Sequence, residues 1–250
     1  MDVHKPKQRH DWRTFLAEVG TIVLGVVIAL GAEQAVDALH WRGKVAEARE
    51  AMRLELRDDD VPQAYTRPAS AACYARELDA IQAAVDAGAD RAAIMALAQA
   101  YRPPFRTWDT DAWAAVLSSD VASHVSARQM TLWSGPYRLI PALRTANLAE
   151  QDHLVQLKGG RRSPGHLSDS ETDRMLLALE ALRQDDHQMS FGSLFLLVAA
   201  ADAGIETPEN LKRQILAALR AKLGPCVAAP SPKGVDLSAQ VTTRSDPNGG

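Results

Sequence analysis

One apolar segment constrains this chain more than any other feature. Residues 15–32 read FLAEVGTIVLGVVIALGA, and the 14 residues at 19–32 carry no charge. A bilayer core of about 30 Å needs ~20 helical residues, so a spanning helix would extend upstream past Glu18, whose carboxylate would lie near the lipid headgroups. The pattern predicts a transmembrane helix at residues 15–35.

Two tryptophans flank this segment at a distance that suits a full bilayer. Trp12 and Trp41 are 29 positions apart, which corresponds to roughly 43 Å of helix, and tryptophan is enriched at both membrane interfaces. Two other interpretations stay open. The segment could be a buried core helix, or a cleaved signal peptide with a small-residue cleavage site at residues 29–31. The basic n-region of such a peptide would consist of Lys5, Lys7, Arg9 and Arg13.

The distribution of positive charge predicts the orientation of the helix. Residues 1–14 carry four Lys or Arg, whereas residues 33–41 carry none. Cytoplasmic flanks of membrane helices are enriched in these residues, and long domains cross the membrane largely regardless of charge. We therefore expect a short cytoplasmic tail at residues 1–14 and the bulk of the chain outside the cytoplasm.

Small residues form a stripe on the predicted transmembrane helix. Ala17, Thr21, Gly25 and Ala29 recur every four residues, a spacing that lets two helix backbones approach closely. The stripe predicts self-association or packing against another membrane protein. The alternative is that glycine and alanine are simply frequent in membrane helices.

Composition favours helices for the rest of the chain. Alanine and leucine are abundant, 46% of the residues are hydrophobic and 24% are charged. We therefore expect an all-α fold with one domain after the membrane helix. The net charge of −3 excludes a strongly basic nucleic-acid-binding protein.

Two cysteines, Cys73 and Cys226, follow the apolar segment. In an oxidising compartment they could pair and close a loop of about 150 residues, which would stabilise the fold by ~4–5 kcal/mol on the chain-entropy estimate. They could equally be two unrelated thiols. Their spacing is not that of a redox motif or a zinc site.

Helix-stop signals divide the chain after the predicted membrane helix. A juxtamembrane helix at residues 36–60 should end at three consecutive aspartates, which are followed by Val61 and Pro62. A loop containing Pro62 and Pro68 should come next, because proline disrupts the helical hydrogen-bond ladder.

A multi-helix bundle domain is expected at residues 61–224, followed by a disordered tail at 225–250 that is rich in Ser, Pro and Gly. Capping boxes at Ser126 and Ser168 mark two helix starts. The run FGSLFLLVAAA at 191–201 is apolar on all sides and should be the most buried helical stretch. The expected helices are 70–88, 90–100, 127–157 with a kink or break at Pro136 or Pro141, 168–203 and 208–223.

Residues that could carry chemistry are few. Trp108 and Trp113, with two aspartates between them, could line a ligand pocket, or the indoles could pack a small core. No nucleophile, phosphate-loop, dinucleotide or metal motif occurs, so we expect no enzymatic activity, no cofactor and no metal. Two groups of neighbouring charges are interpreted as solvated surface. They are His153 with Glu150 and Asp152, and His187 with Asp185 and Asp186.

Two runs resemble segments of a broad group of uncharacterised bacterial single-pass membrane proteins. They are FLAEVGTIVLGVVIALGAEQAVDALHWRGKVAEAREAMRLEL at 15–56 and TWDTDAWAAVLSSDVASHVS at 107–126. Members of that group share a span of the form FL.E...I.LGVLIAL and an exit of the form EQ.V..LHWR. The resemblance rests mainly on residues 12–57. It implies an N-terminal anchor in the bacterial inner membrane and a helical periplasmic domain, and it implies no activity.

Three functions compete at this point. The first is a non-enzymatic membrane-anchored protein that acts by protein–protein interaction, as a homo-oligomer or as an accessory of a membrane complex. The second is an extracytoplasmic ligand-binding or sensory domain. The third is an exported soluble enzyme whose mature chain begins near Ala32 after cleavage. The expected partners are the lipid bilayer and a second membrane protein or copy, and no nucleic acid.

Overall fold

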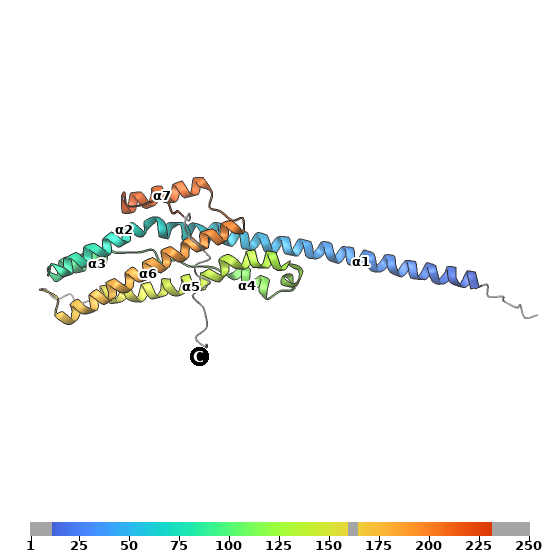
Figure 1. The fold of residues 1–250 in the computed structure, drawn as a ribbon, viewed down its shortest axis with the longest axis horizontal. Helices are drawn as coiled ribbons and strands as arrows, with labels where there is room; N and C mark the ends of the chain where they lie inside the picture. The colour runs from blue at the N-terminus through green and yellow to red at the C-terminus, as the bar shows by residue number, and fades with distance from the viewer. Residues whose placement is uncertain (1–11, 160–164, 232–250) are drawn as a thin grey trace, which may run out of the picture. The chain divides into compact units, whose positions relative to one another are not determined.

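In the computed structural model the described residues are 12–159 and 165–231, and they confirm the all-α prediction, because no strand occurs among them. Most of the predicted cytoplasmic tail and of the predicted disordered tail lies outside the described residues, as do residues 160–164. The helical elements (Figure 1) are α1 (Trp12–Glu55), the π-helical turn η1 (Leu56–Asp60), α2 (Val61–Asp86), α3 (Arg91–Ala100), α4 (Asp111–Leu117), the 3-10 turn η2 (Asp120–His124), α5 (Ala127–Lys158), α6 (Asp169–Asp202) and α7 (Glu209–Leu223).

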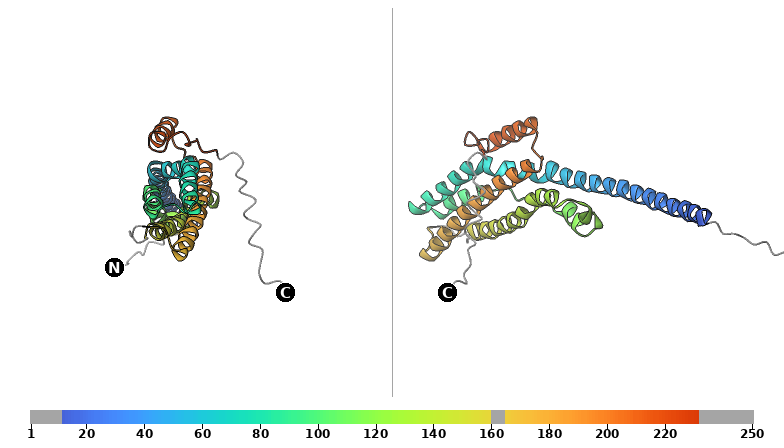
Figure 2. Two further views of the ribbon diagram at one scale, coloured as in Figure 1. Left: turned by 90° about the vertical axis from the view of Figure 1, so that its left-hand side faces the viewer. Right: turned by 45° about the vertical axis from the view of Figure 1, so that its right-hand side comes forward.

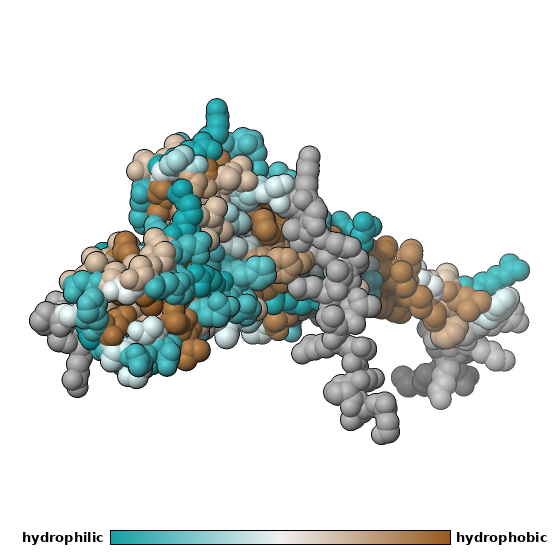
Figure 3. Space-filling model, turned by 60° about the vertical axis from the view of Figure 1, so that its left-hand side comes forward, coloured by the Kyte–Doolittle hydropathy of each residue, from teal (hydrophilic) through white to brown (hydrophobic). Residues whose placement is uncertain are grey.

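The chain divides into two compact units, an N-terminal unit, Met1–Arg49, and a helical domain, Glu50–Gly250. From Trp12 on, the N-terminal unit is one uninterrupted helix, the first part of α1. It is long and apolar enough to cross a membrane, and no residue of its most apolar 18-residue window is buried. Figure 3 shows hydrophobic side chains gathered along this helix. No described residue of the N-terminal unit therefore covers the apolar segment.

The core of the helical domain lies around α6, which packs against both α2 and α5 (Figures 1 and 2). A further helix, α3, packs against α2 and α5. No residue of α6 from Met189 to Ala200 is exposed. Each fully buried Leu or Ile stabilises the fold by ~1.5–3 kcal/mol. The buried cluster consists of Tyr74, Leu78, Ile81, Val85, Ile94, Ala98, Tyr101, Leu154, Leu157, Met175, Ala178, Leu179 and Leu182.

The predicted helix end at residue 60 is wrong. The chain passes through η1 directly into α2, and Pro62 lies in the first turn of α2, where a missing backbone N–H costs little. Pro68 lies inside α2, although proline cannot donate to the helical ladder. The expected loop around the two prolines and the expected helix start at residue 70 are therefore also wrong.

Local capping signals predict correctly where α5 and α6 begin. The Ser126 hydroxyl accepts a hydrogen bond from the first turn of α5, and Ser168 closes a capping box with Glu171, whose carboxylate accepts from the Ser168 backbone N–H at 2.9 Å. Pro136 and Pro141 do not break α5, which remains one helix and curves along its length (Figure 2).

A disulfide attaches the C-terminal helix to the domain. Cys73 on α2 is joined to Cys226, with a Cα–Cα distance of 5.3 Å. Next to the disulfide, the backbone N–H of Ala228 donates to the carbonyl of Ala69 at 3.1 Å. No residue of α7 is buried. The first residues of the predicted disordered tail are thus held against α2, and the disulfide links the segment after α7 to α2.

Replacing both cysteines, Cys73→Ser with Cys226→Ser, should destabilise the domain by ~2–5 kcal/mol, because the crosslink no longer restricts the unfolded chain. The measurement is urea unfolding of the full chain in detergent, compared with the wild type with and without reductant. Because α7 has no buried residue, limited proteolysis should also cleave it first in the variant. Equal stability and equal proteolysis would contradict this role of the disulfide.

Candidate functional site

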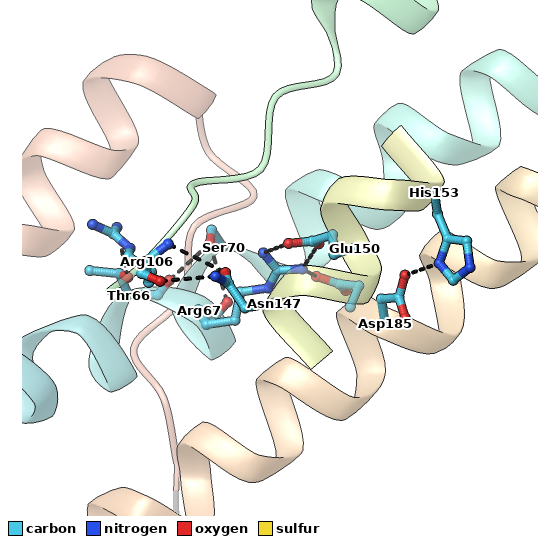
Figure 4. A network of polar contacts seen from close by, with 9 residues as sticks. Thr66, Arg67, Ser70, Arg106, Asn147, Glu150, His153 and Asp185 are labelled. Atoms are coloured by element: carbon cyan, nitrogen blue, oxygen red, sulfur yellow. Dashed lines mark hydrogen bonds and ion pairs between the residues drawn. The ribbon is translucent and has the colours of Figure 1, made fainter. Parts of the chain in front are cut away.

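A cluster of charged side chains lies in the interior of the helical domain, where its three core helices meet (Figure 4). Arg67 on α2 is 3% exposed, and both oxygens of Glu150 on α5 accept hydrogen bonds from its guanidinium, one of them at 3.1 Å. The same guanidinium lies 3.0 Å from a carboxylate oxygen of Asp186 on α6. One positive charge therefore links three helices.

One guanidinium serves two carboxylates in this cluster. Arg67 faces two carboxylates, and burial raises the pKa of both Glu150 and Asp186, while the guanidinium opposes the rise. The ring of Tyr74 lies 5.7 Å from the guanidinium carbon and adds a cation–π contact. Because Glu150 is 0% exposed and Arg67 nearly so, the pair offers no surface to a dissolved ligand. The arrangement serves to hold the helices together.

Neighbouring polar contacts extend the cluster on two sides. His153 on α5 lies 2.6 Å from Asp185 on α6, which is 5% exposed. On the other side, Asn147 accepts from the backbone N–H of Arg106 at 3.3 Å and donates to its carbonyl at 2.9 Å. The Arg106 side chain donates to Thr66 on α2 at 3.1 Å, and burial lowers the pKa of this guanidinium. These contacts fix the segment that connects α3 and α4.

The interpretation of the acidic groups as solvated surface is wrong for three of them, because Glu150, Asp185 and Asp186 are all buried. The helical spacing of the surrounding residues could have shown that two of these acidic residues are buried. On α5, Glu150 falls in a series of buried residues at steps of three and four, and on α6 Asp186 does the same. The two series are 143, 147, 150, 154, 157 and 175, 179, 182, 186, 189, 193, 196, 200.

Acidic side chains around η1 hold the segment that leads into α4. Glu55 accepts a hydrogen bond from the backbone N–H of Ala112 at 2.9 Å and so caps the N-terminus of α4. Asp60 accepts from the backbone N–H of Asp109 at 3.3 Å and is 0% exposed. Burial raises its pKa to about 7, and the nearby charge of Glu55 adds to the rise.

The two tryptophans lie in this same region. Trp108 is 3% exposed, and its carbonyl accepts a hydrogen bond from Arg144 Nε at 2.8 Å. Trp113 stacks on Tyr137, with ring centroids 5.4 Å apart and an interplanar angle of 9°. The tyrosine hydroxyl donates to the carbonyl of Met52 at 3.3 Å. Both indoles thus pack against neighbouring elements of the domain.

A cleft of about 840 Å³ lies elsewhere, between α3 and the facing ends of α5 and α6. Arg91 and Glu171 line it, and this pair forms a salt bridge at 2.7 Å. Neither tryptophan lines the cleft. Within 12–159 and 165–231, no group of three His, Cys, Asp or Glu side chains is placed to hold a metal ion.

The predicted membrane-helix residues all lie on α1 in the N-terminal unit. Ala17, Thr21, Gly25 and Ala29 are exposed. The Thr21 hydroxyl donates to the Ala17 carbonyl at 2.9 Å, so the helix itself satisfies this polar group. Trp12 is 67% exposed. The stripe is therefore open for contact with lipid or with another helix.

Replacing the central cation, Arg67→Met, should cost about 3–5 kcal/mol of unfolding free energy at pH 8, because two buried carboxylates lose their counterion. The loss should shrink toward pH 5, since protonated carboxyls need no counterion. The matched control is Arg183→Met, which breaks an exposed pair with Asp79 and should cost ~1 kcal/mol or less. Equal effects of the two variants would show that the buried cluster does not hold the helices.

Stability should fall as pH rises from about 4 to about 7 because of Asp60. Its folded pKa of about 7 exceeds the ordinary value of 3.8, so the folded state retains a proton that the unfolded state releases. The contribution of Asp60 to the free energy of unfolding is complete below its unfolded-state pKa and is lost as the pH passes its folded-state pKa. Asp60→Asn should flatten this part of the pH–stability curve, measured by thermal unfolding. An unchanged slope would contradict the assignment to Asp60.

Comparison with known proteins adds no assignment: no protein-family model, no curated protein and no solved structure matches this chain. The resemblance to bacterial single-pass membrane proteins therefore stays a prediction from the sequence. A function has to be argued from the exposed apolar helix, the disulfide and the buried charge cluster.

Proposed function

We propose that this protein is anchored in the bacterial inner membrane by a single N-terminal helix and acts by protein–protein interaction rather than by chemistry of its own. In this proposal residues 15–35 span the bilayer, residues 1–14 are cytoplasmic, and the helical domain is periplasmic.

The observation that carries the proposal is the exposed apolar surface of α1. Ile22, Leu24 and Ile28 are each 60% exposed or more. Leaving such a side chain in water forgoes ~1.5–3 kcal/mol relative to burial. In a bilayer this cost disappears, and a helix satisfies its own backbone hydrogen bonds, which any spanning segment must do. The apolar part of the helix, residues 15–35, therefore suits a membrane better than water.

The disulfide supports a periplasmic location for the domain. Structural disulfides persist in oxidising compartments and are rare in the cytoplasm. The Cys73–Cys226 bond lies in the helical domain, after the apolar segment. This agrees with the charge distribution around the segment, which also favours a cytoplasmic N-terminus.

The surface of the helical domain supports action by contact. The charge cluster around Arg67 is buried and joins helices. By contrast, Leu148 and Val155 are 59% and 70% exposed and lie seven residues apart, on one face of α5. Exposed apolar side chains that share a helix face suit contact with another protein.

The test is fractionation of cells that express the full chain, with an intact mass of the product. The wild type should keep its full-length mass and stay in membranes after alkaline carbonate extraction, and external protease should reach the helical domain only after the outer membrane is opened. Leu24→Arg with Val27→Arg should abolish insertion, because each Arg at the centre of a span costs ~2.5–3.5 kcal/mol. The apolar control is Leu24→Ile with Val27→Leu. A soluble product about 30 residues shorter would contradict the anchor and favour a cleaved signal peptide.

A further inference from the structure

Beyond the predicted membrane helix, α1 carries two large apolar side chains in exposed positions. Val36 is 67% exposed and Leu39 is 65% exposed. Isolated apolar side chains are common on protein surfaces and need no explanation. The spacing of these two within a longer series is what makes them informative.

The series alternates between steps of four and three residues, which is the heptad pattern of positions a and d in a coiled coil. Every member is exposed and lies in the N-terminal unit. A Cβ atom added at Gly25 or Gly43 would meet no atom within 4 Å, so this helix face is open at both glycines. Glu50 would occupy the next a position and ends the apolar series. The members are Gly25, Ala29, Ala32, Val36, Leu39, Gly43 and Ala46.

Charges beside the series would pair with opposite charges in a parallel pair of helices. With Val36 at position a, Arg42 falls at position g and Glu47 at position e. In a parallel pair of helices, g of one chain faces the following e of the other, so Arg42 would face Glu47 of a second copy, twice per dimer. Within the described residues, Glu47 forms an exposed pair with Lys44, at 3.4 Å, and such a pair contributes little.

We propose that residues 25–46 form the seam of a parallel two-helix coiled coil between two copies of this chain. The proposal rests on the proposed anchor, because copies inserted with one topology present their helices in the same direction. Inside the bilayer, small residues at Gly25, Ala29 and Ala32 allow close backbone packing. In the interfacial region before Trp41, Val36 and Leu39 bury apolar surface against their counterparts.

The first test is site-directed crosslinking in native membranes with a short bis-maleimide. Val36→Cys and Leu39→Cys occupy seam positions, whereas Asp37→Cys and Ala38→Cys lie between them on the same helix and are the matched controls. The native cysteines are joined to each other, so the wild type should give no product. We expect covalent dimers from the two seam variants and few from the controls. Equal crosslinking at all four positions, or none at the seam, would overturn the proposal, as would a product of the seam variants with another protein in place of the dimer.

The second test reverses the charges in the Leu39→Cys background. Glu47→Arg alone places like charges at the proposed contact and should reduce dimer crosslinking roughly three- to tenfold. Adding Arg42→Glu restores opposite charges with the order exchanged and should restore crosslinking. If the double variant does not recover dimer crosslinking, the parallel pairing is overturned.

Fractionation of the same samples separates this proposal from the anchor. If the chain is in membranes but the crosslinking shows no seam pattern, the coiled coil is wrong and the anchor stands. If the seam pattern appears in a full-length soluble chain, the anchor is wrong and the coiled coil stands.

Discussion

The helical domain depends on one buried cation. A guanidinium removed from water is tolerated only when carboxylates replace its hydration, and Arg67 finds them on two other helices, at Glu150 and Asp186. The contact therefore defines how α2, α5 and α6 must lie, since a shift along any helix would leave a charge unpaired. Apolar side chains such as Leu179 and Leu182 supply the burial energy around it but tolerate small shifts. The charges select one register among the packings that the apolar residues would allow.

Polar contacts also fix the position of the chain around η1. Glu55 and Asp60 direct their carboxylates to backbone N–H groups at the start of α4, so an irregular segment is held by groups on a helix. The π turn has a wider backbone than an α-helix, and such turns recur at functional positions. Here the turn brings Asp60 fully out of solvent, where its carboxyl retains a proton to about pH 7. Its local role is to join α2 to α4 through polar contacts.

Features that depend on neighbouring residues could be predicted from the sequence, and features that depend on distant residues could not. The Ser168–Glu171 capping box is local and is confirmed, as is the uninterrupted apolar part of α1. Pro62 gave a misleading stop signal, because a proline in a first helical turn looks the same in sequence as one after a helix end. Glu150 could have been placed inside from its spacing, but its partner Arg67 lies 83 positions away, and no local pattern reveals that pairing.

The helical domain pairs its buried charges within the chain, whereas the N-terminal unit leaves its apolar side chains exposed. This difference indicates where a partner is needed. In the helical domain, buried charges such as Arg67 are compensated within the chain. In the described part of the N-terminal unit, residues 12–49, apolar side chains are exposed and none of these residues covers them. Under the proposed topology, the hydrocarbon core covers the segment up to residue 35, but Val36 and Leu39 lie in the interfacial region before Trp41, where lipid tails cover them less completely and another apolar surface lowers their free energy. Lipid alone therefore covers this part of the helix incompletely, and the regular spacing of its apolar side chains favours a second identical helix over an irregular partner surface.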